Sequence, residues 1–376
     1  MHIPSLISAA IFVAGISLQA HAQTYAYISS PDDGLISQYH LDEQSGNLVL
    51  VEQIQAGAQV NPMAISPDGK ALFAALRAKP YTVKSYLIDP GTGRLSEKGQ
   101  GPLAESLAYL STDRSGRWLL GASYGGNLIS SQPIDSDHLP GSAIQTVQTG
   151  PHAHSICVDP SNRFAYSGNL GADHVLQFTF NAKDGHLAPI KDGYVTTPPK
   201  TGPRHLAISP DGRFLFVVGE MAGTVTSYAI DSATGALSEV GKASGIPQSL
   251  GLAHGEVRDA SNNNLADDPT RRIWAADLRL SPDGKLLYMT ERTSSSVSAF
   301  SVDQKTGKLL FLGNYPVNEQ QPRNIAFSPN GHWLVVTGEK STEVGSYAVG
   351  KRGELMRVGA APSGKGAVWI EMWNTP

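Results

Sequence analysis

Ile208-Ser209-Pro210-Asp211-Gly212-Arg213 is one of several copies of the same short pattern in this chain. Two further close copies are Ile65-Ser66-Pro67-Asp68-Gly69-Lys70 and Leu280-Ser281-Pro282-Asp283-Gly284-Lys285. Proline presets the backbone of a turn, aspartate bonds back to the backbone, and glycine takes the positive-φ position. A β-forming run such as Phe214-Leu215-Phe216-Val217-Val218 follows each turn. With weaker copies in 111–116, 158–163 and 327–331, the pattern predicts six strand–turn–strand units.

A second repeat is an Asp-x-x-Thr-Gly-x-Leu hairpin. It occurs at 89–95, 231–237 and 303–309, with relatives at 42–48, 181–187 and 350–355 and a degenerate copy at 134–139. Single repeats measure 47 residues from Gly46 to Gly93 and 50 from Gly185 to Gly235. The 72 residues from Gly235 to Gly307 therefore contain an insertion, which we expect at about 244–274.

Short strands in a repeat of 40–50 residues are typical of a β-propeller with four strands per blade. The hairpin occurs seven times but the turn only six, so one blade lacks its first strand. The C-terminal run 367–372 can supply that strand, and residues 24–56 can supply the other three. We therefore predict an all-β fold. Residues 23–376 form one seven-bladed propeller of four antiparallel strands per blade, and N- and C-terminal strands close the ring in one blade. Closure removes the open edge that invites aggregation.

Composition excludes several classes of protein. A single cysteine forbids an intrachain disulfide and every multi-cysteine metal site. The chain has 29 Lys and Arg against 33 Asp and Glu, a net charge of −4. It therefore lacks the excess of basic residues that is typical of a nucleic-acid-binding protein. The sequence also contains no Gly-x-Ser-x-Gly elbow, His-Glu-x-x-His helix, Walker loop or dinucleotide fingerprint.

The amino terminus has the pattern of a secretory signal. Residues 5–20 are apolar and uncharged, and Ala20-His21-Ala22 places small residues at −3 and −1 before Gln23. The apolar segment is too short to span a membrane comfortably. We expect residues 1–22 to be a cleaved signal peptide. The mature protein is then periplasmic or secreted and has no membrane segment, and its oligomeric state stays open.

Functional residues are expected where the blades differ. The innermost strands of a propeller line its central channel, and the residues just before these strands lie at one mouth. Charged and imidazole side chains gather at these positions: His152, His154, Arg204, His205, Glu220, Glu291, Arg292, Arg323 and Glu339. Several titratable groups converging on a concave mouth are typical of a polar ligand site.

Five motifs give the chain a more specific likeness. They are His152-Ala153-His154-Ser155, Asn169-Leu170-Gly171-Ala172-Asp173, Gly202-Pro203-Arg204-His205, Ala275-Ala276-Asp277 and Gln321-Pro322-Arg323-Asn324. In order and spacing the chain resembles the seven-bladed propeller lactonase family, which includes 6-phosphogluconolactonase and 3-carboxy-muconate lactonizing enzyme. The resemblance implies a catalytic set of His154, Arg204, Glu220 and Arg292 with no metal or cofactor. Departures are Gly219, where the family usually has Asn, and Thr290-Glu291 in place of Ser-Asn.

The chemistry of these residues suits the opening of a lactone. Hydrolysis needs a base for water, for which His154 and Glu220 are both candidates, and cations such as Arg204 and Arg292 for the oxyanion. We expect substrate contacts from His152, His205, Arg323 and Glu291.

The same residues also allow interpretations other than catalysis of lactone hydrolysis. His152 and His154, two apart on a strand, could be a metal pair, although no third ligand is evident. Glu220 and Arg204 could form an ordinary surface ion pair.

The sequence therefore predicts a secreted hydrolase. Its partner would be a small-molecule lactone of the gluconolactone or 6-phosphogluconolactone type, and export argues against the phosphorylated form. The alternatives are a non-enzymatic propeller binding scaffold and a muconate-type cycloisomerase.

Overall fold

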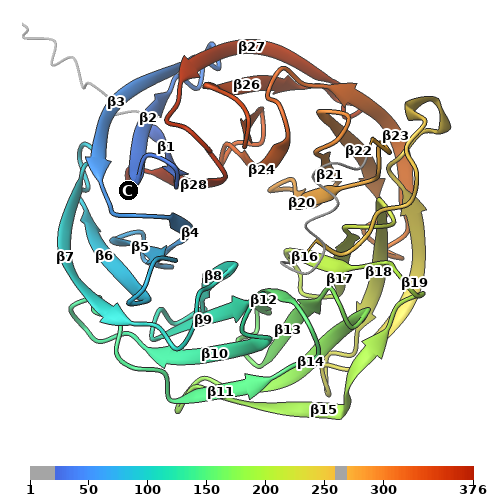
Figure 1. Ribbon diagram of the computed structural model, residues 1–376, viewed down its shortest axis with the longest axis horizontal. Coiled ribbons are helices and arrows are strands. Elements are labelled where there is room, and N and C mark those ends of the chain that lie inside the picture. Colours follow the sequence, from blue (N-terminus) through green and yellow to red (C-terminus); the bar gives the residue numbers. More distant parts are fainter. Residues whose placement is uncertain (1–21, 259–268) are drawn as a thin grey trace, which may run out of the picture.

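The computed structural model describes residues 22–258 and 269–376; residues 1–21 of the predicted signal peptide lie outside this part. The chain forms seven four-stranded antiparallel sheets arranged as blades around a central axis (Figure 1). Blade 1 consists of β4 to β7, and blades 2 to 6 follow in chain order. Blade 7 consists of β28, β1, β2 and β3. The predicted seven-bladed propeller is thus confirmed.

Each blade runs from an inner strand at the axis to an outer strand at the rim. The inner strands are β4 (Val60–Ile65), β8 (Tyr109–Thr112), β12 (Ala153–Val158), β16 (Pro203–Ile208), β20 (Ala275–Leu280), β24 (Pro322–Phe327) and β28 (Trp369–Asn374). The second strands are β5 (Ala71–Leu76), β9 (Trp118–Ser123), β13 (Phe164–Asn169), β17 (Phe214–Gly219), β21 (Leu286–Glu291), β25 (Trp333–Gly338) and β1 (Thr24–Ser30). The third strands are β6 (Thr82–Ile88), β10 (Leu128–Pro133), β14 (His174–Asn181), β18 (Thr224–Ile230), β22 (Ser296–Val302), β26 (Glu343–Val349) and β2 (Leu35–Leu41). The outer strands are β7 (Leu95–Pro102), β11 (Gln145–Gln148), β15 (His186–Thr196), β19 (Leu237–Ser244), β23 (Leu309–Pro316), β27 (Leu355–Pro362) and β3 (Leu48–Gln55).

The two ends of the chain close the ring. Strand β28 pairs antiparallel with β1, from Ser29 opposite Trp369 to Thr24 opposite Asn374. Figure 1 shows these strands, the last and the first in the chain, side by side in blade 7. This confirms the predicted closure. The inner strand begins at Trp369, two residues after the expected start at Ala367.

The repeated turns are held by their own side chains. In the turn after β4, the Ser66 hydroxyl donates to Asp68 at 2.6 Å and accepts from the Ala71 amide at 2.9 Å. The turn after β16 repeats this pattern, with Ser209 donating to Asp211 at 2.7 Å. These bonds satisfy backbone and side-chain groups within the turn itself.

The hairpin glycines join one blade to the next. Gly185 of blade 3 has a φ of +76° and lies on the Trp118 ring of blade 2, where an added Cβ would come within 2.3 Å of the ring. Gly235 of blade 4 has the same relation to Phe164 of blade 3. Glycine is required at both positions, because the backbone is left-handed and the aromatic ring leaves no room for a side chain.

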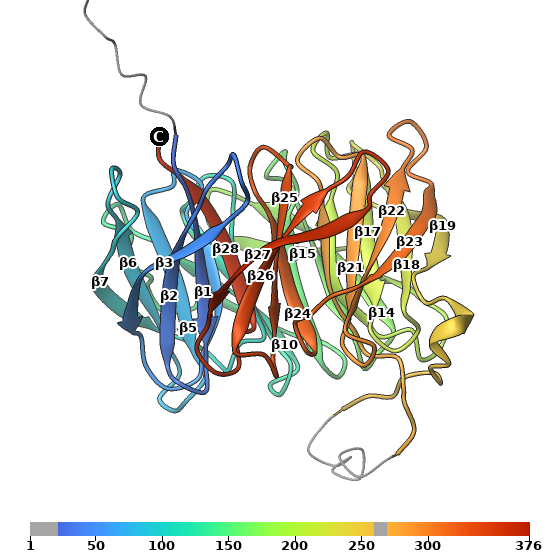
Figure 2. The same cartoon turned by 90° about the horizontal axis from the view of Figure 1, so that it is seen from above.

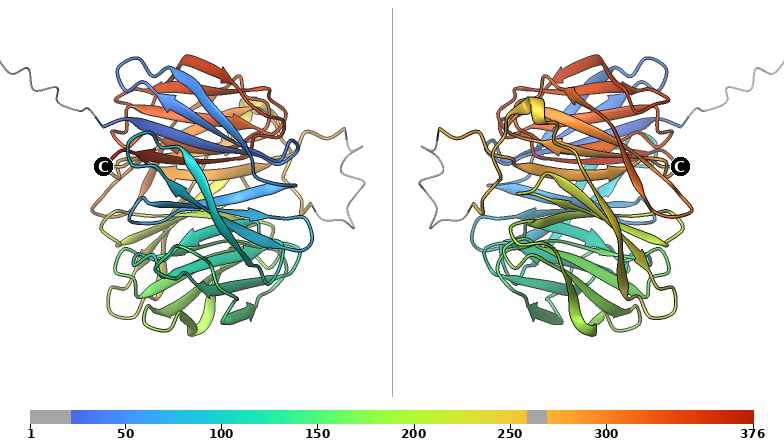
Figure 3. Two further views of the ribbon diagram at one scale, coloured as in Figure 1. Left: turned by 90° about the vertical axis from the view of Figure 1, so that its left-hand side faces the viewer. Right: turned by 90° about the vertical axis from the view of Figure 1, so that its right-hand side faces the viewer.

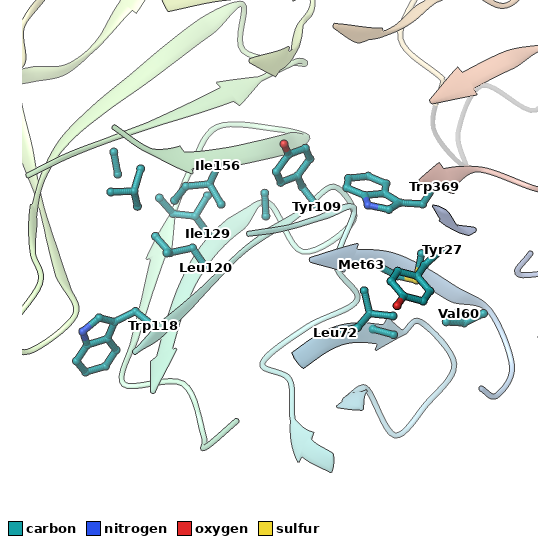
Figure 4. Close-up of a cluster of buried hydrophobic side chains, with 14 of the residues drawn as sticks. Tyr27, Val60, Met63, Leu72, Tyr109, Trp118, Leu120, Ile129, Ile156 and Trp369 are labelled. Carbon is teal, nitrogen blue, oxygen red and sulfur yellow. The ribbon is translucent and has the colours of Figure 1, made fainter. Parts of the chain in front are cut away.

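The apolar core lies between the blades. Figure 4 shows part of it, where Leu120 and Ile129 of blade 2 pack with Ile156 of blade 3. Nearer the axis, the rings of Tyr109 and Trp369 meet edge to face at 5.2 Å between centroids. Each blade buries its faces against two neighbours, so the core is a ring of interfaces.

The longest connection between blades joins β19 to β20. It contains a short 3₁₀ helix, η1 (Gln248–Leu250), and a parallel bridge between Ala253 and Arg272. The Gly255 amide donates to the Met221 carbonyl at 2.8 Å, which fixes the connection to the loop that follows β17. Figures 2 and 3 show the connection on the face of the disc opposite the C-terminus. Within the described ranges, no helix is long and apolar enough to cross a membrane.

Removal of β28 should destroy the fold. A chain ending at Gly366 loses Trp369, Ile370 and Trp373, each at most 5 % exposed, and leaves β1 as an open edge. Burial of these three side chains stabilises by about 5 to 9 kcal/mol, which is comparable to the whole stability of a typical domain. We expect no cooperative thermal transition. A chain ending at Asn374 retains β28 and should unfold as the full chain does; equal melting of the two shortened chains would contradict this account.

Candidate functional site

The inner strands pair irregularly at the start, where several polar side chains gather. The register of β12, β16, β20 and β24 with the neighbouring second strands shifts within the first few residues. A β-bulge breaks strict alternation and re-aims the side chains at the bulge. The residues within these shifts are His154, Arg204, His205, Ala276, Asp277 and Arg323.

A second set of side chains comes from one equivalent position in each blade, the residue directly after the second strand. In blades 4, 5 and 6 this residue is Glu220, Arg292 and Glu339. In blades 1 and 2 it is Arg77 and Tyr124, which our sequence analysis missed. The equivalence of these positions in the repeat is the signal that could have found them.

Glu220 joins two arginines from different blades. Its Oε2 accepts from Arg204 Nε at 2.7 Å and from Arg292 Nη2 at 2.8 Å. The three side chains are 6 %, 1 % and 2 % exposed, respectively. Further bonds run from Arg204 Nη1 to the Ala276 carbonyl at 2.6 Å and from Arg292 Nε to the Trp274 carbonyl at 3.1 Å. This is a buried, bonded network, which contradicts the alternative of a surface ion pair.

His154 lies beside these arginines as a neutral imidazole. It is 5 % exposed, and burial and the nearby Arg204 guanidinium hold its pKa well below the usual range. Its Nδ1 is buried without a hydrogen-bond partner among the described residues. We call His154, Arg204, Glu220 and Arg292 the central cluster. The structure brings together the four residues that the resemblance implied.

His205 lies next to the central cluster and is tied to a carboxylate. Its Nδ1 lies 2.6 Å from Asp277 Oδ1, and its ring centroid is 5.2 Å from that of His154. Asp277 also accepts from Asn324 Nδ2 at 2.8 Å, the Ile325 amide at 3.0 Å and Arg279 Nε at 3.1 Å. Burial and Arg204 lower the pKa of His205 to about 3, although Asp277 acts in the opposite direction. The ring is therefore neutral, and the bond to Asp277 favours the tautomer with the proton on Nδ1.

Arg323 and Glu339 extend the polar set across blade 6. Arg323 Nη1 donates to Glu339 Oε1 at 3.2 Å, and Glu339 Oε2 lies 4.0 Å from Arg292 Nη1. Burial and the positive charge of Arg323 lower the pKa of the half-buried Arg77, whose Nε donates to Ser106 Oγ at 3.2 Å. Three arginines therefore stand near two glutamates, and the excess of positive charge suits an anion or a developing oxyanion.

Two of the residues expected to contact the substrate, His152 and Glu291, interact with neighbouring parts of the protein. His152 precedes β12 with a φ of +65°, and its ring stacks on Tyr124 at 4.1 Å between centroids. Both oxygens of Glu291 are engaged with the adjoining loop: Oε1 accepts from the Trp274 amide and Oε2 from Ser294. Glu291 thus shapes the loop that carries Arg292.

The metal-pair hypothesis assumed that His152 and His154 share one face of a strand. His152 lies outside β12 and a bulge follows it, so the alternation of a regular strand does not relate the two side chains. Among the residues that the structure describes, no group of three or more His, Cys, Asp or Glu side chains is arranged to hold a metal ion.

The fold and the central cluster define a seven-bladed propeller with a polar, arginine-rich site on its axis. The family model described as "Lactonase, 7-bladed beta-propeller" matches residues 25–372, and the chain belongs to this family.

Relatives and solved structures cover nearly the whole chain. A 6-phosphogluconolactonase of Pectobacterium carotovorum is 33% identical over 351 residues, which cover 93% of this chain and 98% of that protein. One of Yersinia pseudotuberculosis is 33% identical, covering 92% and 97%. A solved structure of the Pseudomonas aeruginosa periplasmic gluconolactonase has a TM-score of 0.78 at 23% identity, covering 95% and 100%. A putative 6-phosphogluconolactonase from Bacteroides fragilis has a TM-score of 0.80 at 22% identity, covering 95% and 99%.

Replacement of Glu220 by glutamine should destabilise the protein strongly. It leaves two buried guanidinium groups without their shared carboxylate, and loss of one partner from a buried ion pair costs about 3–5 kcal/mol. The free energy of unfolding from urea titration measures the effect. The control is Glu343→Gln, at the partly exposed ion pair with Arg357, where a loss below about 1 kcal/mol is expected. Equal losses in the two variants would contradict a buried network.

His205 should make the stability depend on pH. Its pKa is about 3 in the folded chain and about 6.5 when unfolded, so below pH 6.5 the unfolded chain takes up a proton that the folded chain does not. The contribution of His205 to stability therefore falls as the pH falls, by about 2 kcal/mol between pH 6.5 and 5.

Urea titrations at several pH values measure this slope. We expect a shallower loss in His205→Asn, whereas His186→Gln, at an exposed histidine, should behave as the wild type does. An unchanged slope in His205→Asn would show that His205 is not a buried neutral group.

Proposed function

We propose that this protein hydrolyses a sugar lactone of the gluconolactone type, and that it does so in the periplasm or outside the cell after loss of residues 1–22. Membership of the lactonase family and the names of the relatives support the reaction class. The observation that carries the proposal is a neutral His154, with Nδ1 unpartnered, beside the paired arginines Arg204 and Arg292.

The arrangement favours His154 over Glu220 as the base. Glu220 Oε2 already accepts hydrogen bonds from both arginines, so this oxygen is committed to holding them. His154 is uncharged, and its Nδ1 has no hydrogen-bond partner among the described residues. We therefore assign His154 to proton transfer, and Glu220 to holding the two guanidinium groups in place.

The reaction then follows from these positions. His154 takes a proton from water as the water oxygen bonds to the lactone carbonyl carbon, and the carbonyl oxygen becomes an oxyanion. Arg204 Nη2 and Arg292 Nη1, which donate to none of the described residues, supply hydrogen bonds for that oxyanion. The ring carbon–oxygen bond breaks as the oxyanion collapses. The proton on His154 passes to the ring oxygen and leaves an aldonic acid.

A pH-stat assay with glucono-δ-lactone, corrected for spontaneous hydrolysis, tests the proposal. His154→Gln and Arg204→Lys keep most of the side-chain volume and should each lower kcat/KM by about 100-fold or more. The control is His138→Gln, at a histidine on the connection between β10 and β11. Circular dichroism and melting temperature establish that every variant is folded.

The outcomes separate the proposal from its rivals. A folded wild-type chain that opens no sugar lactone would overturn the lactonase and favour a non-enzymatic binding scaffold. Lactonization of a muconate without hydrolysis of a sugar lactone would indicate the cycloisomerase, whose carboxylate substrate could use the same arginines. Full activity in His154→Gln would indicate that Glu220, and not His154, is the general base.

A further inference from the structure

A hollow lies beside Arg292 of the central cluster, at blades 5 and 6. It measures about 470 Å³. Arg258, Arg271 and Arg272 line it from the connection between β19 and β20, while Arg292 and Lys340 line it from the loops after β21 and β25. We call this hollow the rim pocket. It shares Arg292 with the central cluster.

The rim pocket is strongly cationic. Among the described residues that line it, five are Arg or Lys and none is Asp or Glu. Arg272 has Glu256 at 3.5 Å, and Arg292 has Glu220. No ion pair links Arg258, Arg271 or Lys340 to a carboxylate within the described ranges. Like charges gathered in a concave surface create a potential that attracts anions.

Three of these arginines, Arg258, Arg272 and Arg292, are held in place by contacts with other parts of the chain. The Trp274 ring lies between two guanidinium groups, with Arg292 Cζ at 3.8 Å and Arg258 Cζ at 3.7 Å from its centroid. The Arg258 carbonyl accepts from the Tyr124 hydroxyl at 2.8 Å, across the mouth from blade 2. Arg272 belongs to the bridge with Ala253, and its Nη1 donates to the His254 carbonyl at 3.2 Å. Ordered arginines of this kind suit planar or tetrahedral oxyanions, which they bind through paired N–H groups.

We propose that the rim pocket binds an anionic group, a carboxylate or a phosphate, at the end of the ligand remote from the carbon held in the central cluster. This inference rests on the proposed function, because it places the reacting end of a sugar acid or its lactone at Arg204 and Arg292. Arg292 belongs to both sites, and this shared residue is the geometric basis for a single ligand that contacts both. Anionic substituents at the remote end therefore increase affinity. Arg258, Arg271 and Arg272, from the connection between β19 and β20, bind these substituents.

Calorimetric titration of the full chain at low salt tests the proposal with three acids. Gluconate carries one carboxylate, glucarate carries a second at the remote end, and 6-phosphogluconate carries a phosphate there. At least one of the last two should bind about tenfold more tightly than gluconate, as expected for an added charge-assisted contact. Tighter binding of glucarate alone identifies a carboxylate site, and tighter binding of 6-phosphogluconate alone identifies a phosphate site.

The double variant Arg271→Gln/Lys340→Gln should bring the three affinities to within about threefold of one another. Both side chains are exposed, so the fold should survive, and the melting temperature checks this. The matched control is Lys305→Gln/Lys351→Gln, at exposed lysines in the hairpins of blades 5 and 6, which should keep the wild-type preference.

Equal affinities in the wild type, or a preference that persists in Arg271→Gln/Lys340→Gln, would overturn the rim pocket as an anion site. The hydrolysis assay separates this result from failure of the proposed function. A preference lost in the double variant, from a chain that opens no lactone, supports the pocket and overturns only the reaction. Hydrolysis without any preference supports the reaction and overturns the pocket.

Discussion

The pairing of β1 with β28 is the constraint on which the rest of the molecule depends. Seven inner strands can start close to one axis only if the ring is closed, and this pairing joins its first and last segments. An open ring would expose the edge of β1 and release the packing of Trp369 and Trp373. The convergence of His154, Arg204 and Arg292 from three different blades is a consequence of that closure.

Closure also brings several charged side chains together in buried positions, where they share carboxylates. Glu220 serves Arg204 and Arg292, and Asp277 serves His205, Arg279 and a backbone amide. A buried carboxylate is tolerated when several donors compensate for its lost hydration. The bulges at the strand starts make this sharing possible, because they turn consecutive residues such as Arg204 and His205 toward partners that strict alternation would separate.

The two histidines remain neutral for the same reason. Burial and the neighbouring Arg204 disfavour a proton on either ring, so both imidazoles are uncharged. A neutral histidine beside fixed guanidinium groups combines a proton acceptor with stabilisation of an oxyanion. This combination, rather than the fold, supports hydrolysis, because the same fold carries many functions.

The sequence by itself determined the seven blades, the closing strand and the positions of most charged residues at the mouth. Turn and hairpin signals act locally, since Ser66, Asp68 and their equivalents bond within a few residues, and local signals can be read along a chain. Only the tertiary structure decided which charged residues meet. His152 and Glu291 look equivalent to His154 and Arg292 in the sequence, yet a positive φ turns the first onto Tyr124 and a local loop occupies the second. The position of Trp274 between Arg258 and Arg292 depends on contacts between separate segments of the chain, which no local pattern records.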